Sequence, residues 1–340
     1  MTYLPTWRTL GLAGAALCAV AWTGSASAAQ WANPQLLTTP GAVKKNINKP
    51  NWVVVDCRSL KDYVKGHIPG AISLGNNCHK ALRDATSRVF RDISKYEKFL
   101  GKVGIGNNTN VVLYYGTSAR SIPQATVAFW VLEYLGHDKV SVLNGGIGAW
   151  RKAGNRLDAK PTRKAPTTFK ANVKKSRYGS TDEIVQVATG KASSQLIDSR
   201  TKKEHIGKDM RAIRGGKVPN TTINVSHVDT LAQAKNAKTG KMGATPYFSA
   251  DVVAAKFASL DKNKRTVAYC QTGTRSTMTY LQLRLLGFKD PANWDDSWRV
   301  YGSTLSLPVA NEQWYNFSGL NNKLKKLAKK VKALEAKAKK

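Results

Sequence analysis

The chain has 340 residues, with 54 Lys and Arg against 21 Asp and Glu, and its formal net charge is +33 at pH 7. This length leaves room for two ordinary domains, each with its own core. The charge indicates an acidic partner, which could be an anionic substrate, an acidic protein or anionic lipid. Nucleic acid is the least favoured partner, because the sequence contains no recognisable nucleic-acid-binding module.

An apolar run near the N-terminus predicts a secretory signal. The run spans residues 10–22 after Arg8, and Ala26-Ser27-Ala28 then offers small residues for cleavage. It is too short for a comfortable transmembrane helix. We therefore expect residues 1–28 to be removed, and the mature protein to be exported to the periplasm of a bacterium.

Three cysteines, Cys57, Cys78 and Cys270, remain after that cleavage. In an oxidising compartment an odd number leaves one thiol free or pairs it between molecules. Cys57 and Cys78 are close enough in sequence to form a disulfide, and they are equally compatible with two small buried residues. Cys270 is the free thiol under either interpretation.

The first half of the mature chain alternates strand and helix patterns. After a polar N-terminal segment, residues 52–58 are typical of a buried parallel strand with a polar end. Further strands are predicted at 111–115 and 140–143, and a long apolar helix is predicted at 121–135. This alternation predicts an α/β fold in which a mainly parallel sheet has helices on both faces.

The same order of elements returns in the second half. Residues 111–121 align with residues 266–276 without a gap, so that Tyr115 stands opposite Cys270. The repeat therefore has a thiol in one copy only. The predicted organisation is a signal peptide (1–28), an N-terminal segment (29–50), a first domain (51–159), a linker (160–175), a second domain (176–318) and a basic tail (319–340).

Cys270 lies in a good setting for a reactive sulfur. It follows the apolar strand 266–269 and precedes a Gly-containing loop and a helix that starts at Ser276. Converging backbone N–H groups and a helix N-terminus lower the pKa of a thiol, and the thiolate is the nucleophile. Arg275 is placed to hold an anionic substrate or a charged sulfur adduct. The alternative is a buried, inert cysteine at the end of a strand.

Four motifs resemble those of the rhodanese family. The run VDCR at 55–58, followed by GHIPGA at 66–71, resembles the entry motif, and GGIGAW at 145–150 resembles the end motif. WDDSW at 294–298 is similar to the closing motif of tandem-domain sulfurtransferases. CQTGTRS at 270–276 resembles the active-site loop Cys-x-x-Gly-x-Arg-Ser. The resemblance implies two tandem rhodanese-like domains, of which the second carries a persulfide-forming cysteine.

The resemblance also implies roles for particular residues. Cys270 would be the catalytic nucleophile, which takes sulfur from a donor such as thiosulfate or 3-mercaptopyruvate and passes it to a thiol or cyanide. No cofactor is implied, and no spacing of His, Cys, Asp or Glu suggests a metal site. The residues expected to contact the donor are Gln271, Thr272, Gly273, Thr274, Arg275 and Ser276, with Asp198, Arg200 and Trp298 in supporting positions.

Several residues depart from the family pattern. Thr272 stands where animal rhodaneses resemble one another in carrying a lysine, and Glu204 stands near the usual place of a substrate arginine. Arg211 and Arg214 could supply that charge, or they could be solvated loop residues. These departures leave open a second function: a non-catalytic rhodanese-fold protein that docks an acidic periplasmic partner.

Phosphatase or arsenate reductase activity is a minor alternative. Related loops with five residues between the cysteine and the arginine hold a tetrahedral oxyanion. Here four residues separate Cys270 from Arg275, and this shorter loop favours sulfur transfer.

The C-terminal tail has a pattern of its own. Leu324, Leu327, Val331, Leu334 and Ala338 form one apolar stripe, and nine lysines and one glutamate occupy much of the rest of residues 321–340. The pattern predicts a basic amphipathic helix that could bind an acidic protein, an anionic membrane surface or a second copy of itself through Lys323–Lys340. A disordered, solubilising lysine tail is the alternative.

Overall fold

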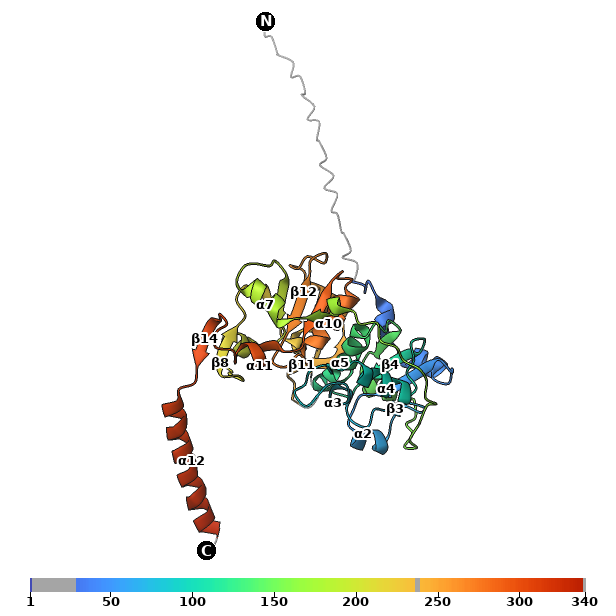
Figure 1. Cartoon of the computed structure of the whole chain (residues 1–340), viewed down its shortest axis with the longest axis horizontal. Coiled ribbons are helices and arrows are strands. Elements are labelled where there is room, and N and C mark those ends of the chain that lie inside the picture. Colours follow the sequence, from blue (N-terminus) through green and yellow to red (C-terminus); the bar gives the residue numbers. More distant parts are fainter. Residues whose placement is uncertain (2–28, 236–238, 339–340) are drawn as a thin grey trace.

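A computed structural model describes Met1 and residues 29–235 and 239–338. The predicted signal peptide, with Cys18, therefore lies outside the described residues apart from Met1. Two α/β bodies lie side by side, and one helix projects from them at the C-terminal end (Figure 1). In the described part of the chain, no helix is both long and apolar enough to cross a membrane.

The first sheet is entirely parallel. Its strands, in spatial order, are β1 (Leu37–Thr38), β5 (Val140–Leu143), β4 (Asn110–Tyr114), β2 (Trp52–Asp56) and β3 (Ile72–Ser73). The helices around it are α1 (Pro40–Asn46), α2 (Leu60–Lys65), α3 (Cys78–Ala81), α4 (Ser94–Lys102), α5 (Ile122–Tyr134) and α6 (Gly146–Lys152), with short 3₁₀ turns at Pro34–Leu36 and Ala119–Ser121.

Alternate residues of the central strands face opposite layers of helices, because successive side chains of a strand point to opposite faces. Val53 and Val55 of β2 pack into the core that contains α4 and α5. Val54, between them, packs into the core that contains α1 and α6. The sheet is thus buried on both faces, which explains why its strands are continuously apolar.

The second sheet repeats this arrangement. Its parallel strands, in spatial order, are β6 (Tyr178–Gly179), β13 (Pro291–Trp294), β12 (Thr266–Tyr269), β7 (Gln195–Asp198) and β9 (Ile223–Asn224). Its helices are α7 (Thr181–Ala188), α8 (Lys202–His205), α9 (Ala250–Lys256), α10 (Ser276–Leu285) and α11 (Ser297–Tyr301), with 3₁₀ turns at Lys175–Arg177 and His227–Thr230. Side chains of α7 and α11 cover one face, and those of α9 and α10 cover the other.

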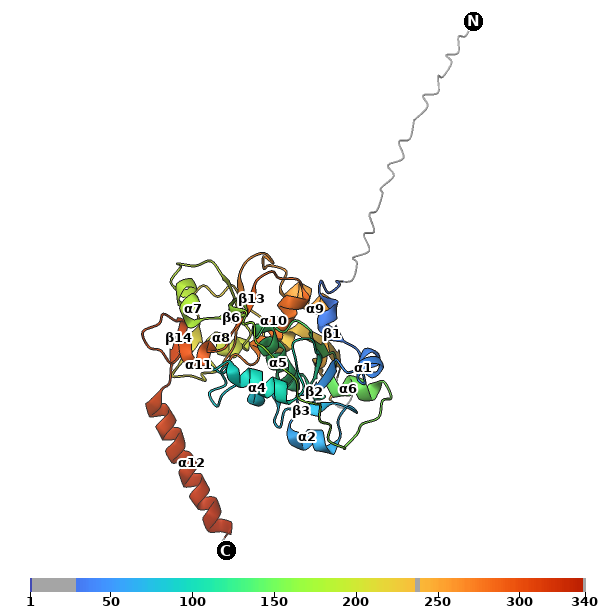
Figure 2. The same ribbon diagram turned by 45° about the vertical axis from the view of Figure 1, so that its right-hand side comes forward.

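Two antiparallel pairs accompany the second domain. β10 (Leu231–Lys235) pairs with β11 (Met242–Phe248), and β8 (Arg214–Lys217) pairs with β14 (Ala310–Trp314). After β14 the chain continues into α12 (Phe317–Ala338), none of whose residues is buried. Two views, 45° apart, both show α12 pointing away from the two domains (Figure 2).

The segments around the first domain are packed against it. β1, from the polar N-terminal segment, pairs with β5. In the segment between the domains, Phe169 is buried, and the backbone N–H groups of Thr167 and Asn172 donate to Gly101 O and Leu135 O. The segment at 160–175 therefore runs along the surface of the first domain in a defined path.

The two domains meet through α5 and α10, the helices that follow the matched loops. Met278, Tyr280 and Leu281 of α10 belong to the same apolar core as α5. Glu133 of α5 is buried there, and it accepts hydrogen bonds from Tyr280 Oη and from the Arg284 guanidinium. The two-domain α/β fold with parallel sheets, helices on both faces and a C-terminal basic helix, as expected from the sequence, is confirmed.

Candidate active site

Cys270 lies at the carboxyl end of β12, where the chain turns into α10. Its side chain is fully buried, whereas Gln271, Thr272, Thr274 and Arg275 of the following loop are partly exposed. These four side chains form the exposed part of the loop. The structure thus brings together the loop residues that the sequence predicted to surround the thiol.

The loop is held from behind by the WDDSW segment. Ser297 Oγ accepts hydrogen bonds from the backbone N–H groups of Cys270 (3.1 Å) and Gly273 (3.0 Å), and it donates to Trp294 O (2.6 Å). Gly273 has a positive φ of 65°, and a Cβ there would lie 2.6 Å from Asp295 Cα. Only glycine fits this turn without displacing the backbone of Asp295. The N–H of Gly273 donates to Ser297, so this group of the loop is not free to bond the sulfur.

The surroundings of Cys270 favour its thiolate. Burial alone would raise the thiol pKa, but the positive charge of Arg275 and the backbone N–H groups of Thr272 and Ser276 outweigh burial and leave the pKa below its usual value. The Ser276 hydroxyl donates to Asn293 Oδ1 (2.6 Å), so its proton is already used. A lowered thiol pKa increases the share of thiolate, which is the nucleophilic form of a cysteine.

Arg275 is oriented by the carboxylate of Glu204, which lies in α8. Its two terminal nitrogens donate to the two oxygens of Glu204 at 2.8 Å and 2.7 Å, a bidentate pair. Glu204 is itself fixed by a capping box with Thr201 at the start of α8. Burial raises the pKa of Glu204, but the hydrogen bond and charge of Arg275 dominate and lower it to about 2. Glu204 thus positions the cation beside the sulfur.

Asp198 and Arg200 form a buried pair at the end of β7. Arg200 donates to both oxygens of Asp198 and to Gly216 O, and Tyr269 Oη donates to Asp198. Burial opposes the charge of Asp198, but Arg200 lowers its carboxyl pKa to about 2. The Arg200 guanidinium also lies over the ring of Trp298, 4.5 Å from its centroid. These contacts join the end of β7 to β8 and to the Trp298 ring of α11.

The first domain contains the same pair at the end of β2. There Arg58 donates to Asp56 and to Gly66 O, and Tyr114 Oη donates to Asp56. Because this copy has no thiol in its loop, the Asp–Arg arrangement is present with and without a candidate nucleophile. Tyr115, which stands where the second copy has Cys270, is buried, and its hydroxyl donates to Pro246 O of β11 (2.6 Å).

Arg83, from the first domain, reaches the candidate active-site loop and was not identified from the sequence. Its guanidinium donates to Asp295 Oδ1 (2.9 Å), to Thr272 O (3.3 Å) and to Thr274 Oγ1. The side chains of both Arg83 and Asp295 are fully buried. Burial raises the pKa of Asp295 to about 6, and Arg83 opposes that rise, which leaves the carboxylate ionised at neutral pH. No local pattern marks Arg83, since its partners lie about two hundred residues away in the chain.

His227 is a second residue that the sequence did not single out. It is buried in the 3₁₀ turn after β9, and its Nδ1 has no hydrogen-bond partner in the described residues. Burial and the nearby charge of Arg275 lower its pKa to about 4. The imidazole beside Arg275 is therefore neutral at physiological pH.

The two arginines proposed to replace the missing substrate arginine lie in different places. Arg211 is half exposed, pairs with Asp209 and lies 3.8 Å from Glu204, next to the loop. Arg214 is buried in β8 and bonds to Glu312 and to the carbonyls of Thr304 and Leu307. For Arg214 both readings of the sequence were wrong, because the β8–β14 pair takes it out of solvent and away from the site.

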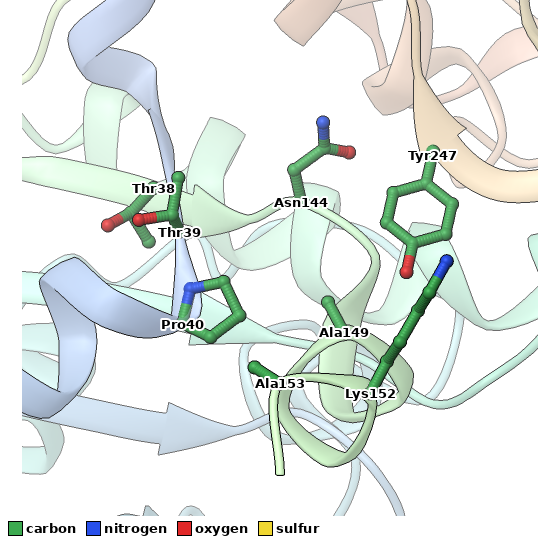
Figure 3. A pocket seen from close by; sticks show the side chains of 8 residues that line it. All are labelled: Thr38, Thr39, Pro40, Asn144, Ala149, Lys152, Ala153 and Tyr247. Carbon is green, nitrogen blue, oxygen red and sulfur yellow. The ribbon is translucent and has the colours of Figure 1, made fainter. Parts of the chain in front are cut away.

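A hollow elsewhere on the surface contains none of the predicted site residues. It lies between the ends of β1 and β5, the start of α1 and the C-terminal half of α6, and Tyr247 of β11 closes one side (Figure 3). Lys152 is the charged residue in its lining, and its side chain extends toward the Tyr247 ring. The other polar side chains of the hollow are hydroxyls and an amide, and the described residues that line it include no thiol, imidazole or carboxylate.

The cysteines of the first domain are joined. Cys57 and Cys78 form a disulfide, and Cys270 is the free cysteine among the described residues. The sequence had left this pairing open. In residues 29–235 and 239–338 no three His, Cys, Asp or Glu side chains lie close enough together to hold a metal ion.

Both halves of the chain match the same family of domains. The Rhodanese-like domain matches residues 39–153 and 181–304, and the chain therefore belongs to the rhodanese family. Its similarity to curated sulfurtransferases indicates a sulfurtransferase-type enzyme, which implies a sulfur donor and a sulfur acceptor in general.

Among those relatives is the "Putative thiosulfate sulfurtransferase" of Saccharopolyspora erythraea, which is 31% identical over 82% of this chain and 97% of its own length. The thiosulfate sulfurtransferase of Corynebacterium glutamicum is 27% identical, over 82% of this chain and 92% of its own. Both relatives match across both domains.

Solved structures share the fold at lower identity. The 3-mercaptopyruvate sulfurtransferase of Escherichia coli is 19% identical, with a TM-score of 0.63 over 77% of this chain and 98% of its own. The anaerobic ergothioneine biosynthesis enzyme of Chlorobium limicola is 20% identical, with a TM-score of 0.68 over 82% of this chain and 71% of its own.

We expect the Cys270 thiol to ionise below the pH at which an ordinary thiol does, and Arg275→Gln to raise that pH. The reason is that Arg275 is the largest favourable influence on the thiolate. The measurement is a pH titration of thiolate absorbance in the ultraviolet, with Cys270→Ser subtracted as the background. Arg275→Lys, which keeps the charge, should lie between wild type and Arg275→Gln. Coincident titrations of wild type and Arg275→Gln would contradict the assignment.

Proposed function

We propose that this protein moves sulfane sulfur from thiosulfate to a thiol or cyanide through a persulfide on Cys270. The observation that carries the proposal is a buried thiol with a lowered pKa, with a bidentately held arginine beside it. Two curated relatives whose names contain thiosulfate sulfurtransferase support the choice of donor.

The proposed reaction has two balanced steps. The Cys270 thiolate attacks the outer sulfur of thiosulfate, the S–S bond of thiosulfate breaks, and sulfite leaves with the bond electrons. The thiolate becomes a persulfide anion. Cyanide or a thiolate then attacks the outer sulfur of the persulfide, and the Cys270 thiolate is released. No external oxidant or reductant is needed in either step.

The loop residues have distinct parts in this proposal. Arg275 neutralises the dianionic donor and the persulfide anion, and Glu204 holds its guanidinium in place. The backbone N–H groups of Thr272 and Ser276 stabilise negative charge on the sulfur before and after transfer. Gln271, Thr272 and Thr274 contact the donor at the exposed side of the loop, where Arg211 adds a further positive charge.

We also infer that the protein acts after export to the periplasm. The Cys57–Cys78 disulfide supports this inference, because disulfides persist in oxidising compartments. Purified from its native cell, the protein should therefore have the mass of a chain that begins near Ala29.

The test of the Cys270 persulfide is intact mass spectrometry of the mature protein after incubation with thiosulfate and, separately, with 3-mercaptopyruvate. We expect a gain of one sulfur, about 32 Da, with thiosulfate, and the loss of that gain when cyanide is added. A gain of one sulfur with 3-mercaptopyruvate but not with thiosulfate would show that thiosulfate is not the donor. No gain with either donor would contradict the persulfide and favour a non-catalytic docking protein.

A further inference from the structure

α12 exposes a continuous apolar stripe. Six large apolar side chains of the helix are 44–66% exposed. They are Phe317, Leu320, Leu324, Leu327, Val331 and Leu334. None of the 22 residues of the helix is buried. Single exposed leucines are common on protein surfaces, but a row of six along one helix indicates a face that another surface covers.

The stripe is narrow, straight and long. With 100° between successive residues, the six side chains fall within an arc of about 100° of the helix circumference. At 1.5 Å per residue the helix is about 33 Å long. This shape fits a helix that lies flat on a surface.

Lysines border the stripe on both sides. At 100° per residue, Lys323, Lys330 and Lys337 follow one side of the stripe, and Lys325 and Lys332 follow the other, while Lys326 and Lys329 lie toward the back of the helix. Glu335, at one edge, is the single acidic residue of the helix. No ion pair involves the described residues of α12, so its lysines are not neutralised within the chain.

The helix is separate from the catalytic fold. The second Rhodanese-like match ends at residue 304, and twelve residues lie between that point and the start of α12 at Phe317. Both views show the helix extending away from the two domains (Figures 1 and 2). The apolar stripe is therefore available to a partner without any change at Cys270.

We propose that α12 binds an anionic lipid surface, with its apolar stripe in the interface and its lysines on the lipid head groups. A helix with a strongly basic polar face and leucines on the other face has the pattern of an interfacial helix. The lysines at both edges can extend their ammonium groups to head groups while their methylene chains lie along the apolar boundary. The net charge of +33 attracts the rest of the protein to the same surface.

The charges disfavour a second copy of the chain as the partner. In a two-stranded coiled coil built on this stripe, Lys323, Lys330 and Lys337 would lie beside the seam, and Glu335 would be the one countercharge on each helix. An acidic protein groove is a less suitable partner, because it would need matching carboxylates along both of its walls. A lipid surface supplies negative charge on both sides of the helix without such matching.

The test is cosedimentation of the purified full-length protein with vesicles of phosphatidylglycerol mixed with phosphatidylcholine. We expect binding to these vesicles, little binding to pure phosphatidylcholine, and at least a ten-fold weaker affinity at about 1 M NaCl, where screening shortens to about 3 Å. Circular dichroism should show helix content unchanged or increased on the vesicles. Equal binding to neutral and anionic vesicles would overturn the proposal.

Two variants separate α12 from the general charge of the protein. Lys325, Lys326, Lys329 and Lys332→Gln should weaken binding at least about ten-fold, since each lysine near an anionic surface contributes substantially. The matched control, Lys44, Lys45, Lys95 and Lys98→Gln, removes the same charge from exposed positions on the first domain and should weaken it much less. Equal losses in the two variants would overturn the role of α12.

A third variant tests the apolar stripe at constant charge. Leu324, Leu327 and Leu334→Ser should lose at least about ten-fold in affinity, because less apolar surface enters the interface. Sulfur transfer in solution should be unchanged in all three variants, since none of these residues lies near Cys270. If the serine variant binds as well as wild type, or if wild type dimerises through α12 and ignores vesicles, the proposal is wrong.

Discussion

Replacing Cys270 by serine is expected to abolish sulfur transfer, with a rate at least about 10³-fold below that of wild type. The hydroxyl of serine does not ionise in the surroundings that stabilise a thiolate, and it cannot form a persulfide. The measurement is the rate of thiocyanate formation from thiosulfate and cyanide. The mass gain with thiosulfate should disappear in the same variant.

Cys270→Ser should leave the fold intact, because serine is close in size to cysteine and Ser297 still binds the loop backbone. Urea unfolding of the variant is the control for this expectation. Cys57 and Cys78 cannot substitute for the missing thiol, since they are joined in a disulfide. Persistent transfer by a folded Cys270→Ser protein would exclude the proposed mechanism.

Replacing Arg83 by methionine is expected to lower the free energy of unfolding by about 3–5 kcal/mol. The variant would leave the carboxylate of Asp295 buried without its cation, 2.9 Å from where the guanidinium had been. The loop would also lose the contacts of Arg83 with Thr272 O and Thr274 Oγ1, so sulfur transfer should fall as well. Urea unfolding and the thiocyanate assay measure the two effects.

Two matched variants separate the charge of Arg83 from its geometry. Arg83→Lys keeps a cation beside Asp295 but cannot bond three acceptors at once, so it should recover more stability than activity. Arg83→Met combined with Asp295→Asn removes both charges and should be more stable than Arg83→Met alone. If Arg83→Met unfolds within about 1 kcal/mol of wild type, the contact between the domains does not hold the loop.

The pH dependence gives a further check on the same pair. The pKa of Asp295 is about 6 in the folded protein, above its ordinary value, so its contribution to stability is full at low pH and is lost as the pH rises toward 6. Without Arg83 the folded pKa rises further, and the loss continues above pH 6. The stability deficit of Arg83→Met should therefore grow between about pH 6 and pH 8.

Much of the molecule could be predicted from its sequence, because the relevant patterns are local. Apolar runs such as residues 266–269 are strands buried on both faces, and the gap-free repeat placed Tyr115 and Cys270 at equivalent positions. The order of Cys270, Gly273 and Arg275 placed a thiol at a strand end before a helix. The apolar spacing in the tail likewise predicted α12, which the structure contains as a helix.

Only the tertiary structure decided which groups control that thiol. Glu204 orients Arg275 from α8, and Arg83 reaches the loop from the other domain. Arg214 lies in a buried strand pair instead of at the site, and the N–H of Gly273 bonds Ser297. The physical reason is that partners of buried polar groups are set by how distant segments pack, whereas strand and helix patterns arise from neighbours in sequence. The sequence thus determined the fold and the position of the Cys270 thiol in it, and the packing of two domains determined the charges around that thiol.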